Sequence, residues 1–289
     1  MTTSTTTEKL FTPVTLGGKN DPIVLQHRVA MAPLTRLRLL IAEATNISAT
    51  ARGHWRSPGI FTEGQIASWK AVTDAVHARG GVIFLQLWHT GRMSHKDNQP
   101  DGILPVSSTG VRPPESETRK VVTKDGRVPI SEYRALETHE IPLICQDYED
   151  AAVNAIEAGF DGVELHAANG SSTTAPTTIV LDAIVAKLDS SKVALRVSPF
   201  GVCLDQRDAT PIETYRYILN KVNDYDLAYL HVIEPRSYHP ENALAPAHGA
   251  AHEFRPIYKG NAPLTDWDFG TFYAGEEHGY IDYPFLTDA

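Results

Sequence analysis

Apolar runs of strand length alternate with helix-period segments along this 289-residue chain, and this alternation is the feature that most limits its possible folds. Strands that are apolar along their whole length, separated by helices, predict a parallel sheet covered by helices. The predicted strands are Val29–Thr35, Leu39–Thr45, Val82–His89, Gly162–Ala167, Val193–Pro199 and Ala228–Pro235. The predicted helices are Gly64–Arg79, Ile141–Ala158, Ile179–Leu188 and Pro211–Val222.

Polar side chains gather at the carboxyl ends of these predicted strands. In parallel α/β folds the chemistry sits at this edge of the sheet, so these positions are the first candidates for a functional site. They are Thr35, Gln86, His89, His166, Asn169, Arg196, His231 and Glu234.

Composition narrows the classes of partner and of compartment. The net charge of -9 and the pI of about 5.7 argue against nucleic acid or an anionic membrane as the main partner. No run of about 18 apolar residues is present to span a membrane. The Thr-rich segment Met1–Lys9 lacks the apolar stretch of a signal peptide, and we expect it to be flexible. Two cysteines make no disulfide framework, so we expect a cytoplasmic protein. The chain length allows one large α/β domain, and we expect a single domain over residues 1–289.

Two stretches do not fit a simple alternation of strands and helices. Only three residues separate Thr35 from Leu39, whereas a parallel crossover needs about a dozen residues. Either these two runs form one long kinked strand, or a helix has been removed between them. A Pro-, Gly- and Ser-rich excursion follows from about Thr90 to Thr138, and a loop of this length is usually functional or carries local structure.

Several distinctive sequence blocks follow one another along nearly the whole chain. They are MAPLTR (31–36), LIAEAT (40–45), PGIFTEGQIASWKAVTDAVHARGG (58–81), QLWHTGR (86–92), AGFDGVELHAANG (158–170), LRVSPFG (195–201), LHVIEPR (230–236) and GYIDYPF (279–285). In this order the blocks resemble the old yellow enzyme family, and among its members the fungal and plant branch most. The resemblance implies a TIM (β/α)8-type barrel that binds FMN, takes electrons from NAD(P)H and reduces activated C=C bonds.

The resemblance also assigns roles to individual residues. Pro33, Leu34 and Thr35 would lie along the flavin ring system, and Ala44 would offer its backbone to the ring edge. Gln86 would hydrogen-bond the pyrimidine part, and Arg196 would place a positive charge near N1 and the C2 oxygen.

On the substrate side, His166 and Asn169 would bind the oxygen of a small enone-like molecule. The residues that would line the substrate pocket are Trp88, Phe272 and Tyr273. Fungal relatives often act in secondary metabolism, so by analogy we expect a role of this kind for the present chain. Neither the substrate, the choice between NADH and NADPH, nor the oligomeric state follows from the sequence.

The chain departs from the family pattern at three places. The family's proton-donating Tyr is replaced by Ser171, whose hydroxyl is a far weaker acid than a phenol. The acidic, Asn- and Arg-rich stretch that follows in the family is replaced by SSTTAPTT (171–178). After Gly260 the chain passes at once to NAPLTDWDFGTFY, so strands seven and eight, with the loops that hold the FMN phosphate, are missing. With the first helix also missing, the expected barrel is incomplete.

Three explanations of these departures stay open: a decayed gene or wrong exon boundaries, a site reduced to a new use, or partner subunits that cover the gap. Three rival functions also stay open. The first is an ene-reductase, and the second is an inactive or flavin-free relative. The third is an interaction protein that pairs through open sheet edges. Strand-end histidines also allow a metal site, but no HxH or HExxH spacing is present, so no metal is expected.

Overall fold

The computed structural model describes residues 14–16, 23–25, 30–31, 39–111, 119–168, 177–200, 208–233, 253–254 and 257–258. Its strands are β1 (Val14–Leu16), β2 (Ile23–Leu25), β3 (Ala30–Met31), β4 (Leu39–Asn46), β5 (Val82–Trp88), β6 (Val106–Ser107), β7 (Lys120–Thr123), β8 (Gly126–Pro129), β9 (Arg134–Ala135), β10 (Gly162–Ala167), β11 (Val193–Val197) and β12 (Leu230–Val232). Its helices are α2 (Glu63–His77), α3 (Ile141–Glu157), α4 (Thr177–Val185) and α5 (Pro211–Val222). Short 3-10 turns are η1 (Ala49–Ala51), η2 (Lys96–Asn98), η3 (Pro100–Gly102), η4 (Thr138–Glu140) and η5 (Ser190–Lys192).

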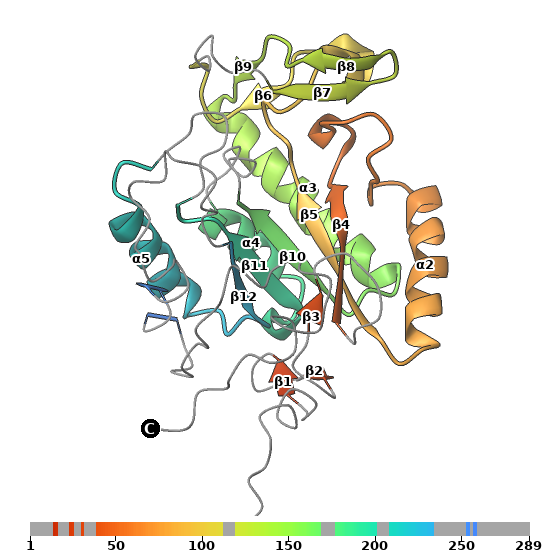
Figure 1. The fold of residues 1–289 in the computed structure, drawn as a ribbon, viewed down its shortest axis with the longest axis vertical. Helices are drawn as coiled ribbons and strands as arrows, with labels where there is room; N and C mark the ends of the chain where they lie inside the picture. The colour runs from red at the N-terminus through yellow and green to blue at the C-terminus, as the bar shows by residue number, and fades with distance from the viewer. Residues whose placement is uncertain are drawn as a thin grey trace, which may run out of the picture.

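A parallel sheet of six strands forms the centre of the described chain, in the order β12-β11-β10-β5-β4-β3 (Figure 1). Each predicted strand corresponds to one strand of this sheet, and β10 and α5 have the predicted bounds. The prediction of an α/β fold with a parallel sheet is therefore confirmed.

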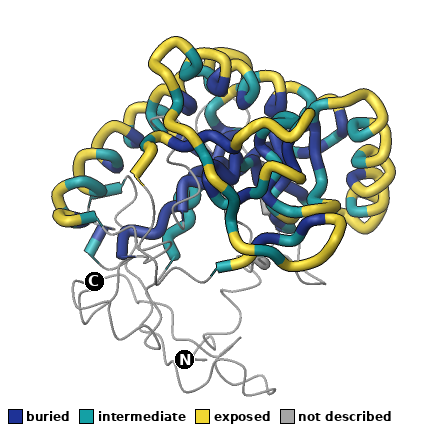
Figure 2. The backbone as a smooth tube through the Cα atoms, turned by 90° about the horizontal axis from the view of Figure 1, so that it is seen from above, coloured by how far each residue is buried: buried dark blue, intermediate teal, exposed yellow. Residues whose placement is uncertain are grey.

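The helices cover one face of this sheet. The side chains that point toward them form the main core, which includes Ile83, Leu85, Val163, Leu165 and Leu195, all almost completely buried. In Figure 2 the buried strands lie inside an arc of helical turns whose outer surfaces are exposed. A curved sheet with helices on its outer side is the arrangement of a (β/α) barrel, seen here over six described strands.

Helices α2 and α3 are joined at their carboxyl ends by one buried contact. The hydroxyl of Thr73 donates to the carbonyl oxygen of Ala158 over 2.7 Å, across 85 residues of sequence. Gly159 follows with a φ of +88°, and a Cβ there would lie 2.7 Å from the Thr73 hydroxyl. Glycine ends α3 because no other residue fits this left-handed turn so close to its neighbour.

The first two strands of the sheet are separate and parallel, because Ala30 pairs with Leu39 and Met31 with Leu40. The alternative of one long kinked strand is therefore wrong. Two paired strands cannot be one strand, and the connection between them has only seven residues, 32–38. That is too short for a helical crossover, in agreement with the loss of a helix at this point.

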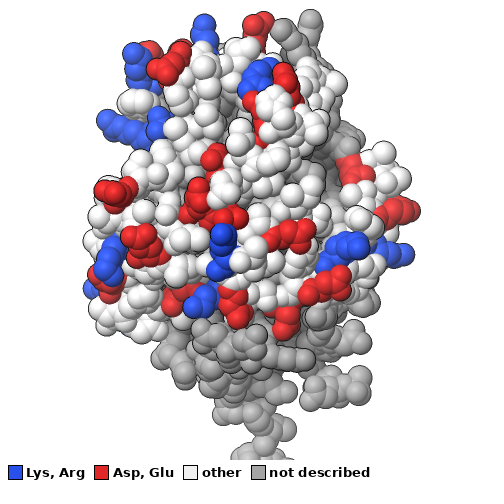
Figure 3. Space-filling view, turned by 180° about the vertical axis from the view of Figure 1, so that it is seen from behind, with Lys and Arg blue, Asp and Glu red and all other residues white. Residues whose placement is uncertain are grey.

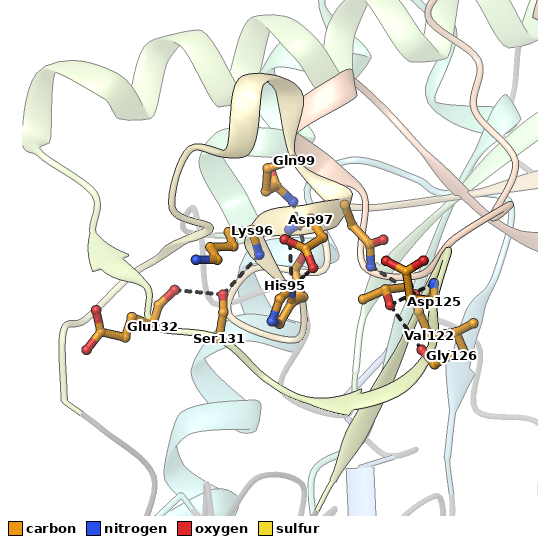
Figure 4. A network of polar contacts seen from close by, with 12 residues as sticks. His95, Lys96, Asp97, Gln99, Val122, Asp125, Gly126, Ser131 and Glu132 are labelled. Atoms are coloured by element: carbon orange, nitrogen blue, oxygen red, sulfur yellow. Dashed lines mark hydrogen bonds and ion pairs between the residues drawn. The ribbon is translucent and has the colours of Figure 1, made fainter.

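The excursion between β5 and α3 has structure of its own, with the antiparallel hairpin β7–β8 and the parallel pair β6–β9. Buried side-chain amides tie it together, and Figure 4 shows part of the network. The Asn98 amide donates to the carbonyl oxygens of Gly53 and Val122 over 3.0 and 2.9 Å. The Gln99 amide donates to the carbonyl of Arg52 over 2.8 Å. The excursion is thereby fixed to the segment that follows β4.

Charged side chains of both signs are interspersed over the face opposite to that of Figure 1, with no field of one sign (Figure 3). Within the described ranges, none of the helices combines the length and hydropathy that a membrane crossing requires.

Candidate functional site

The sheet face that the helices leave uncovered carries side chains in successive layers toward the carboxyl ends of the strands. Residues in register on neighbouring parallel strands point to the same side, so the pairings define the layers. Gly162 pairs with Phe84, and Glu164 pairs with Gln86 in the next layer. One layer further, Arg196 pairs with both His166 and His231. An apolar floor thus lies beneath two polar layers, and the upper of these is near the edge where sites form in such folds.

Glu164 is the centre of the lower polar layer and is completely buried. Its Oε1 accepts from Nε2 of Gln86 over 2.5 Å, and its Oε2 lies 3.0 Å from Nδ1 of His231. Burial by itself would raise the pKa of Glu164. The hydrogen bonds from His231 and Gln86 and the charges of His231 and Arg196 outweigh burial, so that the pKa is lowered. The buried carboxyl is therefore ionised at neutral pH.

His166 lies in the upper layer and is also buried, at 6% exposure. Burial, and then the nearby positive charge of Arg196, lower the pKa of His166 to about 4. The imidazole is therefore neutral at pH 7, with one nitrogen as donor and the other as acceptor. Its buried Nδ1 has no hydrogen-bond partner among the described residues. A neutral imidazole in this state can donate to or accept from a bound molecule without changing its charge.

Arg196 stands beside His166 on the next strand, with its side chain only partly exposed. Its buried Nε has no hydrogen-bond partner in the part of the chain that the structure describes. A buried guanidinium nitrogen without a partner is costly, and such atoms mark places where a ligand supplies the missing acceptor. His166 and Arg196 together therefore present two unsatisfied polar groups on one face.

Trp88 borders this pair, with its ring centroid 6.2 Å from that of His166. Its indole nitrogen donates to Oδ1 of Asn46 over 3.0 Å. The Asn46 amide in turn donates to the carbonyl of Pro58 over 2.7 Å and to the hydroxyl of Ser57 over 2.9 Å. Trp88 is thus a wall whose orientation is fixed by β4 and by the loop after it.

The remaining predicted site residues divide into one that the structure places and six that it does not. Ala44 lies in β4, where the pairing with β5 shifts register between Ala42 and Thr45. Such an irregularity turns backbone groups away from the ladder and can leave them for a ligand. Outside the described residues lie Pro33, Leu34, Thr35, Asn169, Phe272 and Tyr273, together with Ser171 and the segment after Gly260.

The strand-end histidines lie in different environments. Nδ1 of His89 accepts from the backbone of Gly91 over 3.0 Å, and burial lowers the pKa of His89 to about 4. Nδ1 of His95 accepts from the backbone of Asp97 over 3.2 Å. Across the described ranges, no three His, Cys, Asp or Glu side chains gather as metal ligands would.

Sequence reasoning missed two members of the polar layers. Glu164 was passed over within a strand, although a carboxylate inside an otherwise apolar strand is itself a signal, since it needs partners. His231 was noted only as a strand-end residue. Its contact with Glu164 joins positions 67 residues apart, and the contact between Gln86 and Glu164 joins positions 78 residues apart.

Comparison with solved structures gives the same fold. The match to morphinone reductase in complex with tetrahydroNAD has a TM-score of 0.73 at 34% identity, over 97% of this chain and 98% of that one. The match to an old yellow enzyme homologue from Zymomonas mobilis has a TM-score of 0.72 at 27% identity, over 96% and 100% of the two chains.

Curated proteins show the same likeness over nearly the whole chain. The 12-oxophytodienoate reductase 1 of Oryza sativa subsp. japonica is 34% identical, over 96% of this chain and 93% of that protein. A putative 12-oxophytodienoate reductase-like protein 1 of Arabidopsis thaliana is 36% identical over 73% and 76%. The rice alignment runs over 368 residues and is longer than the 289-residue chain. It therefore contains stretches for which this chain has no counterpart.

A family model described as the NADH:flavin oxidoreductase / NADH oxidase family matches residues 37–171, which include β4, β5 and β10 with Gln86, Glu164 and His166. On the fold, the site and these likenesses together, the chain belongs to this family of flavin oxidoreductases, the old yellow enzymes.

Proposed function

We propose that the protein is an FMN-dependent, NAD(P)H-linked reductase of activated C=C bonds. The observation that carries the proposal is the pair His166 and Arg196. Each has a buried nitrogen without a partner among the described residues, and the two lie side by side above the ionised Glu164. The family uses FMN and NAD(P)H, and reductases of enone-like molecules are among the relatives. The resemblance of the sequence to fungal members suggests a setting in secondary metabolism.

The described residues fit the ring part of FMN. The Nε of Arg196 is a cationic donor without an acceptor in the described part of the chain, and a flavin's pyrimidine ring presents carbonyl oxygens to such a donor. Gln86 uses its Nε2 on Glu164, which leaves the carbonyl oxygen of its amide for an N–H donor. Ala44, Pro33, Leu34 and Thr35 would complete the cradle. When bound, FMN supplies the hydride that the alkene carbon receives.

On this proposal, His166 and Asn169 hold the substrate's carbonyl oxygen. A neutral His166 donates an N–H to that oxygen and draws electrons toward it, which makes the β-carbon of the alkene electron-poor. Trp88 excludes water from one side, and Phe272 and Tyr273 would line the pocket. NAD(P)H and the enone-like substrate would use the same pocket in turn.

The α-carbon must also receive a proton, and Ser171 stands where the family has a Tyr. Tyr229 does not replace it. Burial, and then the charge of Glu164, raise the pKa of Tyr229 well above its ordinary range. Tyr229 also lies in the layer below His231, packed on Phe84 with ring centroids 5.6 Å apart. We propose that water supplies this proton.

A specific observation favours a second candidate, a flavin-free relative that binds a carbonyl compound without redox chemistry. The sequence runs from Gly260 directly to NAPLTDWDFGTFY, and the family's phosphate loops have no counterpart in this chain. Without those contacts the phosphate loses its main anchor, although His166 would still polarise a carbonyl.

The absorption spectrum of the purified protein between 300 and 550 nm separates the two candidates. We expect flavin bands and, after denaturation, close to one released FMN per chain. A folded protein that is colourless and takes up no added FMN would overturn the reductase and leave the flavin-free binder.

The His166→Ala variant tests the oxygen-binding role. We expect a phenol, which offers a similar oxygen, to bind at least about tenfold more weakly, the effect of losing one buried hydrogen bond. Isothermal titration calorimetry measures this with or without flavin. His77→Ala is the matched control, because His77 pairs with Asp161 at the end of α2, 3.0 Å away and outside the polar layers. Equal phenol affinity in wild type and His166→Ala would contradict the assignment.

A further inference from the structure

Glu164 contacts two polar side chains from different strands, and this sets the direction of both hydrogen bonds. An ionised carboxylate only accepts. Gln86 must therefore turn its Nε2 toward Glu164, and His231 must carry a proton on Nδ1. Because Glu164 is completely buried, water does not compete for these bonds.

Each partner consequently presents a defined group elsewhere. The amide of Gln86 has a single oxygen, and with the nitrogen on Glu164 that oxygen is available as an acceptor. Turning the amide by 180° would replace this acceptor by a donor. A bound ring with an N–H at this position would then meet a like group, and binding would weaken.

The geometry points to Glu164 as a positioning residue that fixes the polarity of Gln86 and His231 and so selects a ligand with an N–H donor facing Gln86. The selection of the ligand rests on the proposed function, in which this ligand is the pyrimidine ring of FMN. The fixed polarity of Gln86 and His231 is a property of the protein itself and is testable without any ligand.

Glu164→Gln is the informative variant, because it keeps the shape and replaces one acceptor oxygen by a donor. Either Gln86 or His231 must then face a group of the wrong kind. We expect His231 to lose its proton at Nδ1, or the side-chain amide of Gln86 to turn. Nitrogen-15 NMR of selectively labelled histidine and glutamine reports both, with peaks assigned from His231→Asn and Gln86→Leu variants. FMN affinity is measured by fluorescence quenching, and we expect a loss of at least about tenfold.

Two further variants keep the experiment decisive. Glu164→Asp retains a carboxylate that can only accept, so His231 and Gln86 should keep their wild-type polarity in this variant. It therefore distinguishes the loss of the carboxylate from a general loss of structure. Asp161→Asn is the matched control. Asp161 directly precedes β10 and, like Glu164, contacts a residue of β5 and a histidine. Its Oδ2 accepts from the backbone nitrogen of Ile83 over 2.8 Å and lies 3.0 Å from Nε2 of His77. It lies at the opposite end of the strand, so its variant should leave FMN affinity unchanged.

The outcomes separate the two ideas. If His231 and Gln86 give wild-type resonances in Glu164→Gln, the positioning role is overturned. If they change and FMN affinity falls, with rescue in Glu164→Asp, both parts stand. If they change but FMN affinity does not, Glu164 does not select the ligand. If the wild type takes up no FMN, the proposed function fails, and the resonances alone still decide the positioning role.

Discussion

The Gly162→Ala variant is expected to unfold with a free energy about 3 kcal/mol lower than that of the wild type, the upper range for overpacking a buried site. A Cβ at this position would meet the backbone oxygen of Lys192 and come within 2.5 Å of Cζ of Phe84. Backbone cannot retreat as a flexible side chain can, and the Phe84 ring is itself completely buried. Urea unfolding followed by circular dichroism measures the change.

Gly64→Ala is the control for this prediction. Gly64 is exposed in the first turn of α2, and a Cβ there would have no heavy atom within 4 Å. Alanine should therefore leave stability unchanged or raise it by up to about 0.5 kcal/mol. If Gly162→Ala proved as stable as Gly64→Ala, the close packing of Phe84 over β10 would be wrong.

Local patterns were sufficient to predict most of the sheet and its helices. A strand buried on both faces is mostly apolar, and α2 and α3 each end near a glycine, so that the predicted and observed bounds lie close together. The pairing of β3 with β4 could not be predicted in this way. Which strands become neighbours depends on contacts across the fold, and the pattern of each run was the same for one kinked strand as for two.

The hairpin of the excursion has a signal in the local sequence. Lys124 and Asp125 form the turn between β7 and β8, and Gly126 is the first residue of β8. Asp within a turn, followed directly by Gly, favours such a tight connection. Gly126 has a φ of +123°, which only glycine adopts readily. By contrast, the amides of Asn98 and Gln99 that attach this excursion to residues 52–53 gave no local pattern.

The candidate site was predictable in its residue types and less so in its connections. His166, Gln86, Trp88 and Arg196 lie on one face of the sheet, because side chains in register on parallel strands point to the same side. Their roles at the site stay predictions. Glu164 could not be linked to Gln86 or His231 from sequence alone, since periodicity places a side chain on a face but does not reveal its partner. Those partners decide which atoms remain for a ligand.

Arg196→Met is expected to lower FMN affinity by about 100-fold, since a charged hydrogen bond in a buried place contributes up to about 3 kcal/mol. Methionine keeps most of the side-chain volume and removes only the charge and the donors. The loss also has a consequence that needs no flavin. The positive charge of Arg196 helps to hold the pKa of His166 near 4, so its removal should let His166 titrate at higher pH. The quenching of FMN fluorescence on binding to the protein measures the FMN affinity. A proton NMR titration measures the pKa of His166.

Arg134→Met separates these effects from the general loss of a cation. Arg134 forms a two-pronged ion pair with Glu140, both contacts 2.6 Å long, at a partly exposed position outside the polar layers. Its loss should change neither FMN affinity nor the titration of His166. If Arg196→Met moved the titration of His166 but left FMN affinity intact, Arg196 would be a neighbour of the imidazole without being a flavin contact. If it moved neither, the electrostatic layer built on His166, Arg196 and His231 would be wrong.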